Sequence, residues 1–206
     1  MTPDGIADGI ASAIRDGVYD EGDQLVQEDL AKQFGVSRNP VREALRLLEA
    51  RGLITIRDGG GATVRRLSPD DLAEVYALRV AVEPTIARPV IEGATSRAIA
   101  RLRALAERMA QTSDTAEWLR SNFEFHQLIY ELSDRPRTVS ILTSLLTAAQ
   151  PYARKNVEAL GGRAQADADH IRIIETIVDG DPDALGSALV SHMTQAEHRV
   201  ESSYER

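Results

Sequence analysis

In the first third of the chain, three stretches place their apolar residues at helical spacing, and a stretch with the pattern of a strand follows them. Isoleucines at a spacing of four predict a short helix over residues 5–16 that ends at Gly17. The polar residues 19–24 indicate a turn. A second amphipathic helix ends at Gly35, a residue that readily takes the left-handed conformation after a last helical turn. Its apolar residues are Leu25, Leu30, Ala31 and Phe34.

A third helix is predicted to begin after Ser37, whose hydroxyl can accept a hydrogen bond from a free amide of the first turn. Pro40 lies near the start of this helix, where a missing amide hydrogen costs nothing. One face of the helix is apolar, and we expect it to pack against the core: Val41, Ala44, Leu45 and Leu48. The neighbouring face carries an arginine at every fourth position: Arg38, Arg42 and Arg46.

Two short strands follow this helix, which ends at Gly52. Residues 53–56 (LITI) form the first strand and residues 62–66 (ATVRR) its returning partner, with a turn at residues 58–61 (DGGG). Three helices followed by a two-stranded hairpin predict a winged helix-turn-helix over residues 1–66, in which the hairpin is the wing.

Strand signals vanish after the wing. Ser68 is a suitable helix cap and Pro69 a suitable first-turn residue, so a helix begins there. Pro84 and Pro89 should bend or split it. Clusters of turn-forming residues divide the rest of the chain into six predicted helices, at 69–92, 95–112, 115–132, 136–158, 163–179 and 182–204. The predicted fold is mainly α, with the N-terminal winged helix-turn-helix followed by an all-α six-helix bundle domain over residues 67–206.

Composition excludes several classes of protein. The chain has no cysteine, so it can form neither a disulfide framework nor a thiolate metal site. The first ten residues are acidic where a signal peptide would be basic. The longest apolar run, at residues 141–149, is far short of a membrane span. We therefore expect a cytoplasmic protein that makes no membrane contact.

Charge is distributed unevenly along the chain, although its net value is −8. Residues 32–66 contain eight basic and three acidic residues, whereas acidic residues outnumber basic ones on either side. The only positive segment is therefore the third helix with its wing. An acidic remainder repels phosphate and keeps non-specific binding to nucleic acid weak. Contact with DNA is thus expected through this one segment.

The polar side chains of the third helix suit the reading of DNA. An arginine fork can bond the O6 and N7 atoms of a guanine edge or two phosphate oxygens, and Asn39 can pair with an adenine edge. A stripe of arginines alone is as typical of a solvated helix face as of a DNA-binding one. The turn, the cap and the wing around it favour DNA binding.

These residues resemble a known family. The run LVQEDLAKQFGVSRNPVREALRLLEARGLI, closed by GGGATV, is similar to the winged helix-turn-helix of the GntR family of bacterial transcription regulators, whose members share the pattern VSRxPVREAL. Many relatives carry an arginine where this chain has Glu28, so one phosphate or base contact of the family is in question here. The resemblance implies DNA-contacting roles for Arg38, Asn39, Arg42 and Gly60.

The helical part more loosely resembles the ligand-binding domain named after FadR, in its VanR-like form with six helices. The resemblance rests on four short stretches: LRVAVEP (78–84), NFEFH (122–126), DH (169–170) and GDPDALGSALVSH (180–192).

Three histidines of this part can share one site. Asn122 and His126 are four residues apart and so share a helix face. His170 and His192 lie on two later helices, beside apolar residues that would turn them toward the core. Three imidazoles can bind a divalent transition metal, with zinc favoured and nickel or manganese as alternatives. A histidine on an apolar face is more often a satisfied core residue, and that interpretation stays open. We expect His198 at the surface.

The resemblance implies a metal site at these positions, because relatives line one with Asp-x-x-x-His and a histidine on each of two later helices. Asn122 stands where most relatives have aspartate. Its amide oxygen offers only a dipole, so the site is more cationic, and we expect weaker metal binding or a stronger preference for an anionic extra ligand. Arg79 is a candidate to hold an effector carboxylate, and a salt bridge with Glu83 is the alternative.

The leading hypothesis is a dimeric, ligand-responsive transcription regulator that reads a palindromic operator, with repression the commoner outcome among relatives. The expected effector is a small organic acid, and sugar acids, hydroxy acids and amino acids fit equally well. One alternative is a metal-free dimeric DNA-binding protein without an effector. Another is a metal-dependent enzyme, which lacks a general base because Glu124 points away from the helix face of His126. We therefore expect no catalysis.

Overall fold

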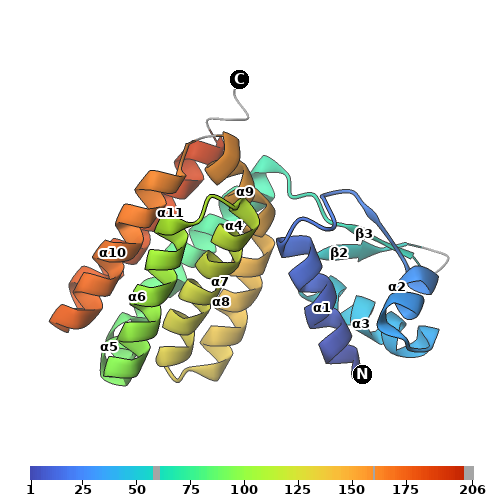
Figure 1. Cartoon of the computed structure of the whole chain (residues 1–206), viewed down its shortest axis with the longest axis horizontal. Helices are drawn as coiled ribbons and strands as arrows, with labels where there is room; N and C mark the ends of the chain where they lie inside the picture. Colours follow the sequence, from blue (N-terminus) through green and yellow to red (C-terminus); the bar gives the residue numbers. More distant parts are fainter. Residues whose placement is uncertain (58–60, 160, 202–206) are drawn as a thin grey trace. The chain divides into compact units, whose positions relative to one another are not determined.

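The computed structural model describes residues 1–57, 61–159 and 161–201. The chain divides into two compact units, Met1–Leu67 and Ser68–Arg206, each of which is described by itself. The first holds three helices and a small sheet, and the second is helical (Figure 1). The predicted fold class, mainly α with an N-terminal winged helix-turn-helix, is confirmed. No helix in the described part of the chain is long and apolar enough to cross a membrane.

The N-terminal unit packs its three helices beside an antiparallel sheet. The helices are α1 (Pro3–Arg15), α2 (Gln27–Phe34) and α3 (Arg38–Ala50), and the strands are β1 (Gln24–Val26), β2 (Ile54–Ile56) and β3 (Gly61–Val64). The strand order is β1-β3-β2, with Leu25 and Ile56 both opposite Ala62. The predicted isoleucine face of α1 is buried and packs with the apolar face of α3 in one core.

The sheet has one strand more than the sequence pattern predicts. We expected Leu25 in the second helix, but it lies in β1 and is 1 % exposed. The helix itself begins only at Gln27, after Val26 in extended conformation. Three residues are too few to show the period of a strand. In the sequence, a leucine two residues before a helix cannot be distinguished from the first apolar residue of that helix.

We call α3 the reading helix. The turn between α2 and this helix agrees only in part with prediction. α2 does end at Gly35, which has a φ of 64° that glycine adopts without strain. Ser37 occupies the N-cap position of α3, but its side chain makes no capping hydrogen bond, so that expectation was wrong. The helix α3 therefore begins after Ser37, whose backbone is extended, without a capping hydrogen bond from the Ser37 hydroxyl.

The C-terminal unit consists of α4 (Pro69–Val82), the 3-10 turn η1 (Glu83–Ile86), α5 (Ala87–Gly93), α6 (Ser96–Gln111), α7 (Thr115–Leu132), α8 (Pro136–Ala148), α9 (Gln150–Ala159), α10 (Arg163–Asp179) and α11 (Pro182–Glu201). The first of the six predicted helices is split at Pro84, as expected. The fourth is also split, at Ala149, which was not predicted. Pro151 follows two residues later, and its missing N–H removes a hydrogen bond from the helix interior.

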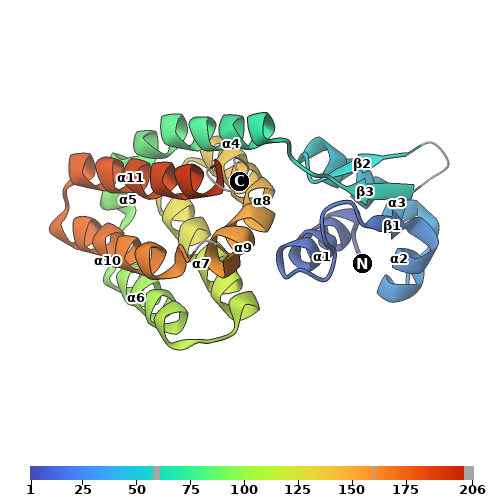
Figure 2. The ribbon, with the colours of Figure 1, turned by 90° about the horizontal axis from the view of Figure 1, so that it is seen from above.

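α7 runs through the middle of this unit and contacts α5, α6, α8 and α9 (Figure 2). Its aromatic residues Trp118, Phe125 and Tyr130 are fully buried. α5 approaches the end of α7 so closely at Gly93 that a Cβ there would collide with the carbonyl oxygen of Leu132. α11 lies against α4, η1, α5, α9 and α10. This packing encloses the polar residues of the candidate site.

Candidate DNA-binding surface and candidate metal site

The reading helix α3 separates its two faces cleanly. Val41, Ala44, Leu45 and Leu48 are buried in the core of the N-terminal unit. The candidate DNA-binding residues that the structure describes are all exposed on the other side: Arg38, Asn39, Arg42 and Arg46. Gly60 of the wing, the remaining candidate, lies outside the described residues. The helix thus presents arginines to solvent from a well-packed base.

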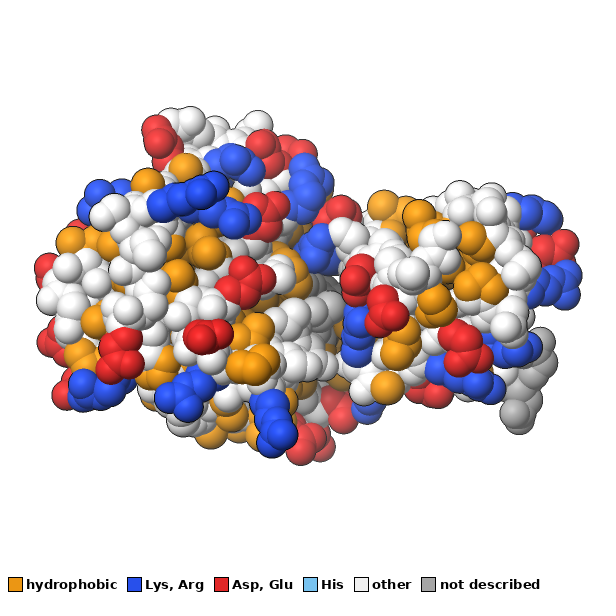
Figure 3. Space-filling model, turned by 90° about the horizontal axis from the view of Figure 1, so that it is seen from below, with side chains coloured by type: hydrophobic (Ala, Val, Ile, Leu, Met, Phe, Trp, Pro, Cys, Tyr) orange, Lys and Arg blue, Asp and Glu red, His pale blue; other side chains and the backbone are white. Residues whose placement is uncertain are grey.

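These exposed side chains are engaged with neighbours. Arg38 pairs with Glu28 at 2.6 Å, Arg46 pairs with Glu43 at 3.0 Å, and Arg42 donates to the side-chain oxygen of Asn39. On the face drawn in Figure 3, basic and acidic side chains are likewise interspersed. An exposed ion pair contributes only about 0.2–1 kcal/mol to stability, so these pairs do not exclude the arginines from DNA contact.

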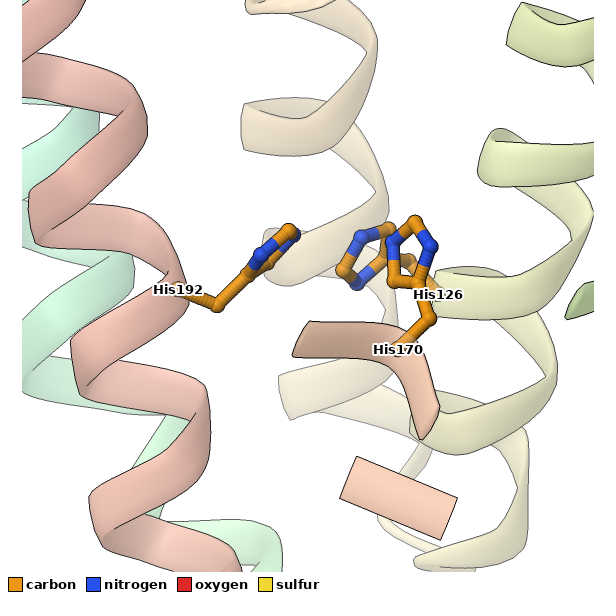
Figure 4. Close-up of side chains that lie close together, drawn as sticks. All are labelled: His126, His170 and His192. Carbon is orange, nitrogen blue, oxygen red and sulfur yellow. The ribbon is translucent and has the colours of Figure 1, made fainter. Parts of the chain in front are cut away.

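Three histidines converge inside the C-terminal unit. His126 comes from α7, His170 from α10 and His192 from α11, and their rings face one another (Figure 4). Their ring centroids lie 5.0–5.5 Å apart, and one nitrogen of each lies within 4.8 Å of the others. All three are buried. The structure therefore brings together the histidines predicted from the sequence, which we call the histidine cluster.

Burial keeps two of these rings neutral. It lowers the pKa of His126 and of His170 well below the ordinary value, and electrostatic interaction with neighbouring groups, His192 first among them, lowers both further. A neutral imidazole has a free lone pair, which is the form that binds a metal. Nδ1 of His126 and both ring nitrogens of His170 have no hydrogen-bond partner among the described residues. Buried nitrogens without partners fit a metal ion, which would accept their lone pairs.

A carboxylate orients the third histidine. Asp169 Oδ2 lies 3.2 Å from His192 Nδ1, and its Oδ1 accepts from Gln165 and Arg172 at 3.0 Å each. Burial raises the pKa of Asp169, but the hydrogen bond from His192 and the other partners outweigh it and bring this pKa below its ordinary value. An ionised Asp169 accepts a hydrogen bond from Nδ1–H of His192, which leaves Nε2 of His192 for a metal. The sequence pattern assigns Asp169 no role, because its contact with His192 joins two different helices.

Asn122 and Arg79 line one small cavity with His126 and His192. The cavity has a volume of about 40 Å³. Asn122 is 6 % exposed and lies one turn before His126 on α7. The structure thus brings the four sequence-predicted polar positions of α4, α7 and α11 to a common space.

Arg79 takes part in a buried triad. Its Nε donates to Glu83 at 2.8 Å, its Nη2 donates to the Tyr130 hydroxyl at 3.0 Å, and that hydroxyl donates to Glu83 at 2.7 Å. Burial lowers the pKa of Arg79, but Tyr130 and Glu83 raise it more, so the guanidinium stays charged. The salt bridge that we named as the alternative is therefore present. These hydrogen bonds use Nε and Nη2, and Arg79 is one of the residues that line the cavity.

The remaining candidates lie away from the site. Glu124 is exposed on α7 and does not line the cavity, so it cannot serve as a base there. His198 is exposed, as predicted.

A winged helix-turn-helix with exposed arginines, followed by a helical unit that contains a cavity with histidines in its lining, defines a DNA-binding transcription regulator. Residues 2–64 match the family described as bacterial regulatory proteins, gntR family, and residues 74–195 match the FCD domain. The chain belongs to the GntR family.

Named relatives agree with this assignment. The chain is 31% identical to the HTH-type transcriptional repressor NanR of Klebsiella aerogenes over 211 residues, which cover 91% of this chain and 81% of that protein. It is 34% identical over 134 residues to the uncharacterized HTH-type transcriptional regulator YdhC of Bacillus subtilis, covering 63% of this chain and 59% of YdhC. E. coli McbR/YncC has the same fold, with a TM-score of 0.87 at 22% identity and 97% coverage of both chains.

Proposed function

We propose that the protein is a repressor that binds a palindromic operator as a homodimer and responds to a small organic acid held beside a divalent metal ion. The observation that carries this proposal is the histidine cluster, in which buried imidazole nitrogens without partners among the described residues adjoin a cavity lined by polar and apolar side chains. The similarity to NanR, which is named a transcriptional repressor, supports repression and not activation of the controlled genes. Such a regulator acts on the chromosome, which places it in the cytoplasm.

The reading helix contacts the operator in this proposal. Arg38, Asn39, Arg42 and Arg46 contact base edges or phosphates, and Gly60 of the wing approaches the backbone. A single winged domain reads only one half-site, so pairing two copies supplies affinity and specificity. Leu78 of α4 and Ile141 of α8 are exposed by 44% and 54% on helices that contact each other, and this apolar face suits a dimer contact.

His126, His170 and His192 hold the metal, and Asn122 lies near enough to add its amide oxygen. Three nitrogen ligands and an open position favour zinc, with nickel or manganese as alternatives. The metal supplies a positive centre for an anionic ligand. The neutral amide of Asn122 leaves that charge uncompensated, and the charged guanidinium of Arg79 belongs to the lining of the same cavity, so a carboxylate is the favoured effector group.

The test is a fluorescence anisotropy titration of an operator selected from random duplex DNA. Zinc-loaded protein is titrated alone and with each member of a panel of sugar acids, hydroxy acids and amino acids. We expect at least one acid to lower operator affinity about fivefold or more, the range of a typical coupling between two sites. His170→Leu should bind the same operator and lose the response. A wild type that ignores every acid, or a variant that responds equally, contradicts the proposal.

A further inference from the structure

The first turn of α2 places a carboxylate beside the first arginine of the reading helix. Glu28 Oε2 lies 2.6 Å from Arg38 Nη2, and Glu28 Oε1 lies 3.4 Å from Lys32 Nζ. The three side chains form a row that links α2 to the start of α3. Their side chains are 52%, 66% and 70% exposed for Glu28, Arg38 and Lys32, so the row is open to a ligand.

This row does not hold the domain together. The core of the N-terminal unit is formed by buried apolar residues of α1, α3 and the sheet. An exposed ion pair adds only about 0.2–1 kcal/mol to stability. A carboxylate on the same surface as the arginines is, moreover, unfavourable for binding a polyanion. A role in DNA selection accounts for both facts.

The pair restricts what Arg38 can contact. A guanidinium has five N–H donors, and Glu28 takes one from Nη2, which fixes the plane of the fork and leaves the other donors available. If Arg38 moved to a phosphate, Glu28 would face the DNA backbone with Lys32 as its only partner. That penalty disfavours phosphate contact and favours a base contact made with the pair intact.

We propose that Glu28 is a specificity-determining residue, which holds the Arg38 guanidinium toward one guanine in each half-site and withholds it from phosphates. The proposal rests on the DNA-reading role proposed above for Arg38. Glu28 itself is a positioning residue, because it acts on the DNA through Arg38.

The experiment is a selection of binding sites from duplex DNA with a randomised centre, made with the full-length chain. Four proteins are compared: wild type, Arg38→Ala, Glu28→Ala and Asp29→Ala. Asp29 is the matched control, because it lies in the same turn, carries the same charge and is 72% exposed, but among the described residues its carboxylate pairs only with Lys32, at 3.8 Å. Circular dichroism checks that each exposed-site variant is folded.

We expect Arg38→Ala and Glu28→Ala to lose preference at the same base pair of each half-site. The loss in Glu28→Ala should be about fivefold or more, the lower end of what one arginine–guanine contact discriminates. Binding of Glu28→Ala to random DNA should show a salt dependence steeper by about one ion, because Arg38 is released to a phosphate. Asp29→Ala should keep the wild-type preferences at every position.

Two results overturn the proposal while DNA reading by Arg38 stands. The first is a Glu28→Ala variant that does not differ from wild type at the base pair that Arg38→Ala alters. The second is an Asp29→Ala variant that loses the same preference, which would make the effect one of charge alone. If Arg38→Ala leaves every preference unchanged, the reading role of Arg38 fails, and the proposal fails with it.

Discussion

The buried histidines make the stability of the C-terminal unit depend on pH in a way that can be calculated. The pKa values of His126 and His170 lie well below 6.5 in the folded chain, so these rings stay neutral where the unfolded chain takes up protons. The unfolded state then binds more protons, and the free energy of unfolding falls as pH falls below about 6.5. Each histidine contributes about 1.4 kcal/mol per pH unit until its folded pKa is reached.

Two histidines therefore give a slope that approaches about 2.7 kcal/mol per pH unit below pH 6.5, and the slope ends where their lowered folded pKa values are reached. Domain stabilities are typically about 5–15 kcal/mol, so the loss is large enough to measure. Asp169 affects the free energy of unfolding over a different pH range. Its pKa is lowered in the fold, so its stabilisation is present above its unfolded pKa, near 3.8, and is lost only as pH falls through the lower folded value.

The assay is urea denaturation of metal-free protein, treated with a chelator, at several pH values from 5 to 7.5. Trp118 is the single tryptophan of the chain, and its ring centroid lies 6.1 Å from that of His170, so its fluorescence reports the unfolding of this unit. His170→Leu should roughly halve the slope. Equal stability at pH 5.5 and pH 7, or the same slope in wild type and variant, would refute the assignment of neutral buried imidazoles.

Three further substitutions test other parts of the account. Arg42→Ala should weaken binding to the selected operator by about 1–3 kcal/mol in anisotropy measurements at fixed salt, and unchanged affinity would argue against its DNA contact. Asn122→Asp adds a charged oxygen ligand and should raise zinc affinity in a chelator competition, whereas equal affinities would exclude a place beside the metal. Arg79→Met leaves Glu83 buried without its partner and should cost about 3–5 kcal/mol in urea denaturation. Arg79→Met combined with Glu83→Leu should recover most of this loss.

Much of the fold could be predicted because its signals are local and repeated. α1 and α3 each present an apolar residue at every turn, and the stop at Gly35 needs only the conformational freedom of that residue. β1 could not be predicted, because three residues show no period and their pairing with β3 spans a separation of more than thirty residues. The break at Ala149 was within reach of the sequence, since Pro151 cannot donate a helical hydrogen bond.

The candidate site likewise has features that the sequence predicts and features that it does not. Helical spacing predicted that His126, His170 and His192 would turn inward, and resemblance to a family predicted that they would meet. Spacing could not show that Asp169 holds His192, because that contact joins two helices through a particular pair of rotamers. Nor could it decide between an effector and Glu83 as the partner of Arg79. The structure shows that Glu83 is a partner of Arg79 and that Arg79 also lines the cavity.

The most direct test of the central claim is the metal content of the protein, purified without chelators and without a histidine tag, by elemental mass spectrometry. The account predicts close to one zinc, nickel or manganese ion per chain, and its loss in His170→Leu. A wild type that contains no metal and takes up none from a zinc solution would contradict the account, and the histidine cluster would then be a group of core residues.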